Sequence, residues 1–140
     1  MPLRIVAVQR LLHFVPKERQ MSVTPMQVES RLRELGSELD DSHKQLEQAE
    51  HGYFRSKSEY EVGVAAARLR VGQRFADRGT KGTVQEREDL ATIETADLLK
   101  AYFTSEAVVR AARANARRVQ VQIDIARSVG TSVRSSLEMP

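Results

Sequence analysis

Residues 77–86, Asp-Arg-Gly-Thr-Lys-Gly-Thr-Val-Gln-Glu, decide how this chain folds, because they separate two long helical patterns. Gly79 and Gly82 supply two positions that tolerate left-handed backbone geometry, as a reversal of the chain requires. Thr83 and Glu86 have the spacing of a capping box, which marks the start of a helix. The stretch therefore predicts a tip followed by a new helix.

Before this stretch, apolar residues recur every seven positions, which is typical of a coiled-coil helix. Thr24-Pro25-Met26-Gln27 is a second capping box, with proline at the first helical position. Four glycines weaken this helix by about 1 kcal/mol each relative to alanine, so we expect it to depend on a partner helix. One seam position consists of Leu32, Leu39, Leu46, Tyr53, Tyr60 and Ala67, and the other of Val28, Leu35, Ser42, Ala49, Ser56 and Gly63.

After the stretch, a second seven-residue pattern predicts another long helix. Its seam positions are Val84, Ala91, Leu98, Ser105, Ala112, Val119 and Ala126, joined by Thr95, Tyr102, Val109, Ala116 and Ile123. Gly130 is expected to stop this helix, because glycine is the common residue just beyond a helix C-terminus. The expected organisation is an arm at 1–23, a helical hairpin at 24–130 with helices at about 25–76 and 84–129 and a tip at 77–83, and a polar tail at 131–140.

Charge alternates along the chain in four blocks. Residues 24–50 hold three basic and seven acidic side chains (−4), and residues 51–81 hold seven and three (+4). Residues 82–106 hold two and six (−4), and residues 107–140 hold six and two (+4). Folding the chain at the glycines places each acidic block beside a basic one, whereas parallel pairing would place like charges together. The sequence therefore predicts an all-α protein, one long antiparallel two-helix hairpin.

Such a hairpin buries only one stripe of each helix, which is a thin core for a chain of 140 residues. Apolar residues off the seam could supply a second contact surface, so we expect a homo-oligomer. These residues are Phe54, Val62, Leu69, Leu90, Leu99, Phe103, Val108 and Val121.

Composition narrows the possible classes of protein. The chain has no cysteine, which excludes disulfides and thiolate zinc sites and suits a reducing cytoplasm. The sequence contains no run approaching the roughly 20 apolar residues of a membrane span, so no membrane association is expected. A net charge of +3 is too small to indicate nucleic-acid binding by itself.

The first 23 residues differ from the rest, with four basic side chains and one acidic. One hypothesis is that translation begins at Met21, because Lys17-Glu18-Arg19 can be encoded by a purine-rich stretch resembling a bacterial ribosome-binding site. The alternative is a short amphipathic arm carrying Leu3, Val6, Val8, Leu11, Leu12 and Phe14. The intact mass of the protein from its native host would distinguish the two.

Motifs for catalysis or cofactor binding are not found. His43 and His51 are eight residues apart, whereas metal ligands on one helix are three or four apart. Asp40 and Asp41 beside His43 are more typical of a solvated helix face. The glycine-flanked Lys81 lacks the spacing of a phosphate-binding loop. We therefore expect no enzymatic activity, no metal and no cofactor.

Basic side chains are the remaining candidates for function. Residues 66–87 hold six basic and two acidic side chains, a net charge of +4. Arg70, Arg74 and Arg78 recur every four residues and so form a stripe along one helical face. Such a stripe could follow a sugar–phosphate backbone, and repetition in an oligomer would multiply the counterion release that drives binding. The candidate nucleic-acid-binding residues are Arg68, Arg70, Arg74, Arg78 and Lys81, with Gln73 and Phe75 nearby. A merely solvated tip is the alternative.

A second basic group lies on the other predicted helix. Arg110, Arg113 and Arg117 share one helical face, with Arg118 beside it. Because the antiparallel register places Glu47 and Glu50 opposite, we interpret these arginines mainly as ion-pair partners within the hairpin.

Three segments carry a resemblance to a known family. They are Glu59-Tyr60-Glu61-Val62-Gly63-Val64-Ala65-Ala66-Ala67-Arg68-Leu69, the turn from Gly82 to Glu88, and Gln122-Ile123-Asp124-Ile125-Ala126-Arg127-Ser128-Val129-Gly130-Thr131-Ser132-Val133-Arg134. Over about residues 25–135 the chain resembles the UvsY-type recombination mediators of tailed phages. The resemblance implies an oligomeric protein of the host cytoplasm that binds single-stranded DNA and helps load a strand-exchange recombinase. It assigns DNA binding to Arg68 and Arg70, although Ala66 stands where another basic residue would be expected.

Three functions therefore compete. The first is a phage recombination accessory protein that binds single-stranded DNA as a homo-oligomer. The second is a structural or assembly protein of a phage virion, and the third is an adaptor that binds a helix of another protein. Salt-titrated binding to a single-stranded oligonucleotide separates the first from the second.

Overall fold

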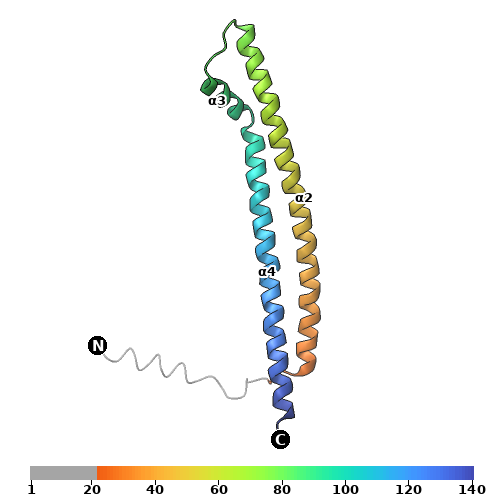
Figure 1. The fold of residues 1–140 in the computed structure, drawn as a ribbon. Coiled ribbons are helices and arrows are strands. Elements are labelled where there is room, and N and C mark those ends of the chain that lie inside the picture. The colour runs from red at the N-terminus through yellow and green to blue at the C-terminus, as the bar shows by residue number, and fades with distance from the viewer. Residues whose placement is uncertain (1–21) are drawn as a thin grey trace, which may run out of the picture.

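The computed structural model describes residues 22–140, which form three α-helices (Figure 1). They are α2 (Pro25–Asp77), α3 (Val84–Glu94) and α4 (Ala96–Glu138). No strand occurs in this part of the chain, so the prediction of an all-helical protein is confirmed for it. The expectations for the N-terminal arm concern residues that lie outside the described part.

The two long helices α2 and α4 lie side by side and run in opposite directions (Figure 1). Val28, at the start of α2, approaches Gly130, near the end of α4. Further along, the side-chain amide of Asn115 donates a hydrogen bond to Ser42 Oγ over 3.0 Å. These contacts place the early part of one helix against the late part of the other.

Both expected capping boxes are present. The Thr24 backbone N–H donates to Gln27 Oε1 over 2.9 Å, and the Gln27 N–H donates to Thr24 Oγ1 over 3.2 Å. Thr83 and Glu86 exchange the same two bonds, over 2.9 and 3.1 Å. Each pair satisfies backbone groups that the first turn of a helix leaves unbonded, so α2 and α3 begin where the sequence predicts.

The chain reverses between α2 and α3 on two glycines. Gly79 has a φ of +72° and Gly82 a φ of +60°, in the left-handed region that other residues avoid. At Gly82 a Cβ would lie 2.6 Å from Cε1 of Phe75, so the ring packs directly on the loop backbone. The reversal therefore depends on glycine at both positions, and at the second also on its small size.

The sequence predicted one continuous helix from residue 84 to about 129, and this prediction is wrong because the helix is interrupted at Thr95. This residue lies between α3 and α4 with a ψ of 10°, and it is only 3% exposed. Its hydroxyl donates to the carbonyl oxygen of Ala91 over 2.8 Å. A threonine hydroxyl bonded back to the preceding turn bends a helix, and α3 is inclined to the axis of α4 (Figure 1).

Gly130 does not stop α4, which continues to Glu138, so the predicted stop is wrong and residues 131–138 of the expected tail belong to the helix. Gly130 is buried and follows Ile123 by seven residues, which makes it the next seam position. A Cβ there would lie 2.9 Å from Cγ1 of Val28. The glycine therefore allows the two helices to approach closely. Beyond it, Thr131 and Ser135 donate to carbonyl oxygens one turn earlier and are compatible with the helix.

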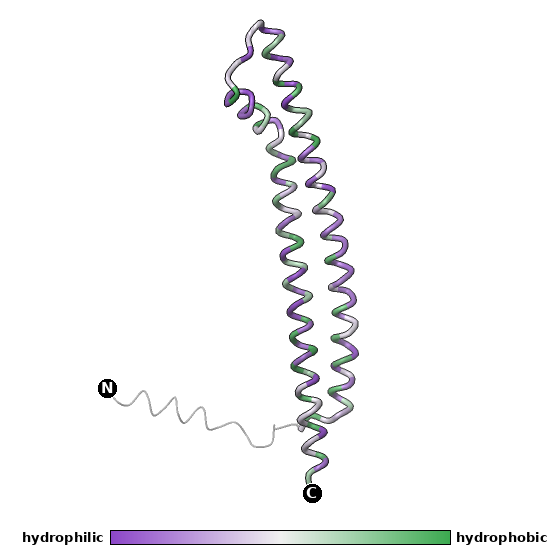
Figure 2. Tube along the Cα trace, in the orientation of Figure 1, coloured by the Kyte–Doolittle hydropathy of each residue, from purple (hydrophilic) through white to green (hydrophobic). Residues whose placement is uncertain are grey.

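The core is a stripe that α2 shares with α4 and, near the loop, with α3. Leu35, Val119 and Ile123 form a buried cluster at the end of the pair opposite the loop. Towards the loop, Ala67 and Val71 of α2 and Ala91 of α3 are at most 1% exposed. Towards the middle the seam residues become small, and Tyr53 and Tyr60 pack on Tyr102, with ring centroids 5.6 and 5.8 Å apart. Apolar and polar residues alternate along the whole length of both helices (Figure 2). Between residues 22 and 140, no helix combines the length and apolar character needed to cross a membrane.

The predicted seams match the observed burial with one exception. Val84, the first residue of α3, is 68% exposed. It lies just after the loop, where α3 has not yet closed on α2, so the seven-residue rule fails there.

Candidate nucleic-acid interface

Three of the five candidate arginines and lysines lie against α3 and are paired with its glutamates. Arg68 donates to Glu88 through Nε and Nη2, over 3.3 and 3.0 Å. Arg70 and Arg74 both pair with Glu94, the former over 3.4 Å. Positions two apart on a helix point about 200° apart, so Arg68 and Arg70 hold α3 from different flanks of α2.

The other two candidates lie at the loop. Arg78 caps the C-terminus of α2, and its backbone N–H donates to the carbonyl oxygens of Arg74 and Phe75. Lys81 lies between the two left-handed glycines and is exposed. Within residues 22–140, neither side chain forms an ion pair, so both charges face solvent.

The neighbouring residues that could have contacted bases are engaged elsewhere. Phe75 packs on Gly82, and the side-chain amide of Gln73 donates to Asp77 over 2.8 Å. The structure therefore brings the five candidates to one end of the molecule, but it does not place an open aromatic ring among them.

Sequence reasoning missed the acidic partners in α3. The basic segment was counted over residues 66–87, which ends one residue before Glu88 and well before Glu94. The alternation of charged blocks did indicate that these partners exist, because it placed the acidic residues 82–106 against the basic residues 51–81. The three ion pairs are half-exposed on the arginine side, at 51–58% of the side chain, and exposed pairs contribute only about 0–1 kcal/mol.

The second basic group is divided among different partners. Arg113 pairs with Glu50 across the two helices over 3.1 Å, as predicted, whereas Arg110 pairs with Glu106 on its own helix over 2.7 Å. Arg118 donates to Asn115. Glu47 does not reach this group and lies 3.9 Å from His51 instead. Only part of the predicted cross-helix pairing is therefore formed.

A second hydrogen bond across the seam, besides the one between Asn115 and Ser42, joins two tyrosines. The hydroxyls of Tyr53 and Tyr102 lie 3.3 Å apart, and either can be the donor. This hydrogen bond, followed by desolvation and by the charges of Glu106 and Glu61, raises the pKa of Tyr102 to about 12. A phenol with so high a pKa stays neutral at physiological pH.

No metal-binding cluster of three or more His, Cys, Asp or Glu side chains is found within the described residues. His43 and His51 are both exposed. The functional candidates in this part of the chain are therefore the cationic end and the exposed apolar surface.

No protein-family model matches this chain, and no curated protein or solved structure matches it either.

Proposed function

We propose that this protein is a homo-oligomer of helical hairpins that binds single-stranded DNA at the end where the chain reverses. The observation that carries the proposal is the gathering of Arg68, Arg70, Arg74, Arg78 and Lys81 at that one end. The DNA-binding half rests on these cations, and the oligomer half on apolar side chains that the helix pair leaves exposed.

Self-assembly is supported by the apolar residues that remain in solvent. Phe54 and Phe103 are 64% and 56% exposed, and each packs edgewise or tilted on a tyrosine of the seam. Val62 and Leu69 are exposed to a similar extent. Large exposed aromatic and aliphatic side chains mark interaction surfaces, because burying them is favourable by about 25 cal/mol per Å².

DNA binding is supported by how weakly the cations are held. The arginine side chains are 51–58% exposed, so a phosphate can approach them from solvent and replace the carboxylate of Glu88, which is 45% exposed, or that of Glu94, which is 24% exposed. The planar guanidinium suits a phosphate as well as it suits a carboxylate. Arg78 and Lys81 need not release a partner at all. Repeated around an oligomer, such ends would give binding that depends steeply on salt.

The test is the salt dependence of binding to a single-stranded oligonucleotide. We expect affinity to fall linearly with salt on a logarithmic scale, with a slope of about 0.7 for each phosphate contact. Arg70→Ala together with Arg74→Ala should lower that slope by about 1.4. Arg33→Ala is the matched control, because Arg33 is exposed and paired with Glu29 but lies at the opposite end.

Glu94→Gln provides the complementary test. It keeps the shape of the side chain while removing the charge that holds Arg70 and Arg74, so DNA binding should become tighter. Glu29→Gln, at the far end, should have no effect. If the wild-type protein does not bind the oligonucleotide even at low salt, the DNA-binding half of the proposal is wrong.

A more specific role, loading a strand-exchange recombinase onto the bound DNA, rests on the resemblance to UvsY-type mediators. It adds a protein partner to the proposed DNA binding. Its test is whether the protein accelerates assembly of a recombinase on DNA already covered by single-strand-binding protein. Acceleration should disappear in the Arg70→Ala, Arg74→Ala variant.

A structural or assembly protein of a virion is the second candidate. The pairing of Arg68, Arg70 and Arg74 with α3 favours it, because the same arginines then serve to hold the helices together. Copurification with intact particles would support this candidate, and tight oligonucleotide binding would count against it.

A further inference from the structure

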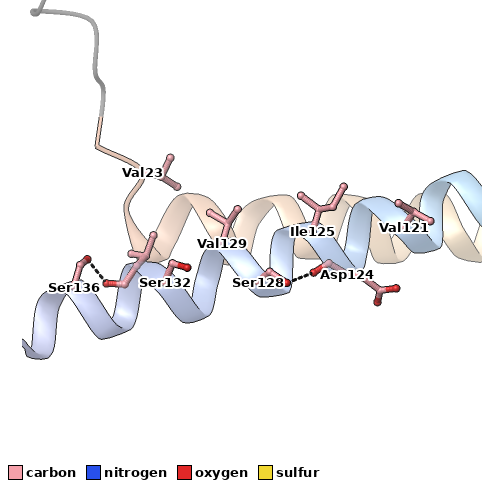
Figure 3. A pocket seen from close by; sticks show the side chains of 9 residues that line it. Val23, Val121, Asp124, Ile125, Ser128, Val129, Ser132 and Ser136 are labelled. Atoms are coloured by element: carbon pink, nitrogen blue, oxygen red, sulfur yellow. Dashed lines mark hydrogen bonds between the residues drawn. The ribbon is translucent and has the colours of Figure 1, made fainter.

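An apolar groove runs along the last third of α4, at the end of the molecule far from the loop (Figure 3). Val121, Ile125 and Val129 follow one another every four residues on this surface, and they are 55%, 58% and 39% exposed. Val23, which precedes the first residue of α2 by two positions, forms part of the lining. The groove has a volume of about 690 Å³.

This groove continues between the two long helices. A second hollow of about 360 Å³ shares Val23, Ile125 and Val129 with it and reaches Leu35 in the core. The apolar surface therefore extends from the exposed face of α4 to the seam between the two long helices.

Two of the serines that line the groove have their hydroxyl hydrogen bonds satisfied within α4. Ser128 Oγ donates to the carbonyl oxygen of Asp124 over 3.0 Å, and Ser136 Oγ donates to that of Val133 over 2.8 Å (Figure 3). Covering a hydroxyl that keeps its hydrogen bond avoids the cost of burying an unpaired one. These serines are also small and allow a second backbone to come close. The surface suits an apolar occupant.

We infer that residues 3–15 of the same chain dock as a helix in this groove. Ile5, Val8, Leu12 and Val15 have the spacing of one helical stripe, three, four and three residues apart. Pro16 follows directly, and helices usually end before a proline. The segment thus has the length and the stripe of a short third helix.

The dimensions agree with docking within one chain. Thirteen helical residues span about 20 Å, and the groove from Val121 to Ser136 spans about 23 Å of α4. The six residues 16–21 reach at most about 20 Å, and Val23, two residues before α2, lines the groove itself. So short a connection gives the segment an effective concentration in the millimolar range, which favours it over a second copy or another protein.

Tryptophan fluorescence of the full chain tests this directly, because the natural sequence has no tryptophan. Leu12→Trp places the reporter on the apolar stripe, and His13→Trp places it about 100° away as a matched control. We expect blue-shifted, quencher-protected emission from Leu12→Trp and solvent-exposed emission from His13→Trp. Equal, solvent-like emission from both would overturn the inference.

Two further variants identify the groove and the donor chain. Adding Ile125→Asp to Leu12→Trp should return the emission to the solvent-exposed value, whereas adding Ile93→Asp should not, because Ile93 is 71% exposed on α3 and lies outside the groove. Circular dichroism of each variant checks that the helices persist. Mixing excess wild-type protein with the Leu12→Trp, Ile125→Asp chain should not restore the blue-shifted emission. Restoration would show that a second copy supplies the groove and would contradict docking within one chain.

Discussion

Tyr102 shows how one side chain connects packing to pH. Its hydroxyl meets that of Tyr53 across the two helices, and its ring stacks on Tyr60 with an interplanar angle of 4°. Three rings fill a part of the seam where the other residues are small. Because the hydrogen bond and partial desolvation favour the neutral phenol, the pKa of Tyr102 is about 12, above its ordinary value of 10.0.

The raised pKa predicts how stability changes at alkaline pH. The folded protein binds the Tyr102 proton more tightly than the unfolded chain does, so this contribution is fully present below pH 10.0 and is lost as pH rises towards about 12. Tyr53→Phe removes the largest cause and should bring the Tyr102 pKa down towards 10.0. Phenolate absorbance during alkaline titration measures it. Glu59→Gln, which removes an acidic side chain outside the causes of the shift, is the control and should leave the pKa near 12.

Within the helices, two glycines of α2 are expected to respond oppositely to the same substitution. A Cβ at Gly36 would meet nothing within 4 Å, whereas a Cβ at Gly63 would overlap the side chain of Leu98. Gly36→Ala should therefore raise the free energy of unfolding by about 1 kcal/mol, the gain in helix propensity. Gly63→Ala should lower it by about 1 kcal/mol, because overpacking outweighs that gain. Urea unfolding at one fixed protein concentration compares the two; equal effects would mean that Leu98 moves freely.

In the loop between α2 and α3, alanine substitutions at the two glycines are expected to destabilise the protein to different extents. Alanine at either Gly79 or Gly82 must adopt a positive φ, at a cost of about 1–2 kcal/mol. At Gly82 it also meets the ring of Phe75, whereas at Gly79 it meets nothing within 4 Å. Gly82→Ala should therefore destabilise the protein more than Gly79→Ala in thermal unfolding. Phe75→Ala in the same chain should bring the two costs closer together.

For the whole molecule, the thin core predicts dependence on self-association. Phe54→Asp with Phe103→Asp should lower the mass seen in sedimentation equilibrium and make the helices melt at lower temperature, since the oligomer stabilises the folded chain. Met26→Asp replaces a residue that is 79% exposed at the far end of α2, and it should change neither. A wild-type protein that is monomeric at all concentrations would contradict the prediction.

Much of the fold was predictable because it depends on local chemistry. The capping boxes at Thr24 and Thr83 act within one turn, and the seven-residue seams depend only on helical geometry. Most residues at the predicted seams are buried or partly buried in the structure, from Val28 to Ile123. The all-helical class followed from the same patterns.

The position of the candidate site was predictable from the sequence, but the pairing of its arginines with glutamates was not. The sequence indicated which cations gather at the reversal, because all five lie within 14 consecutive residues, 68–81, at the end of α2 and in the loop. It did not show that Glu88 and Glu94 hold three of them, since that depends on how α3, which ends just before Thr95, is inclined towards α2. The length of α4 was missed for a similar reason, because glycine is equally suited to ending a helix and to letting two helices touch.

By itself, then, the sequence determined the all-helical class, the first residues of α2 and α3 and most residues of the seam, because capping and periodicity are short-range properties. Only the tertiary structure decided that Thr95 bends the second half, that Gly130 lies against Val28, and that an apolar groove remains open along α4. These features depend on which atoms of distant segments come within contact distance, and no local pattern contains that information.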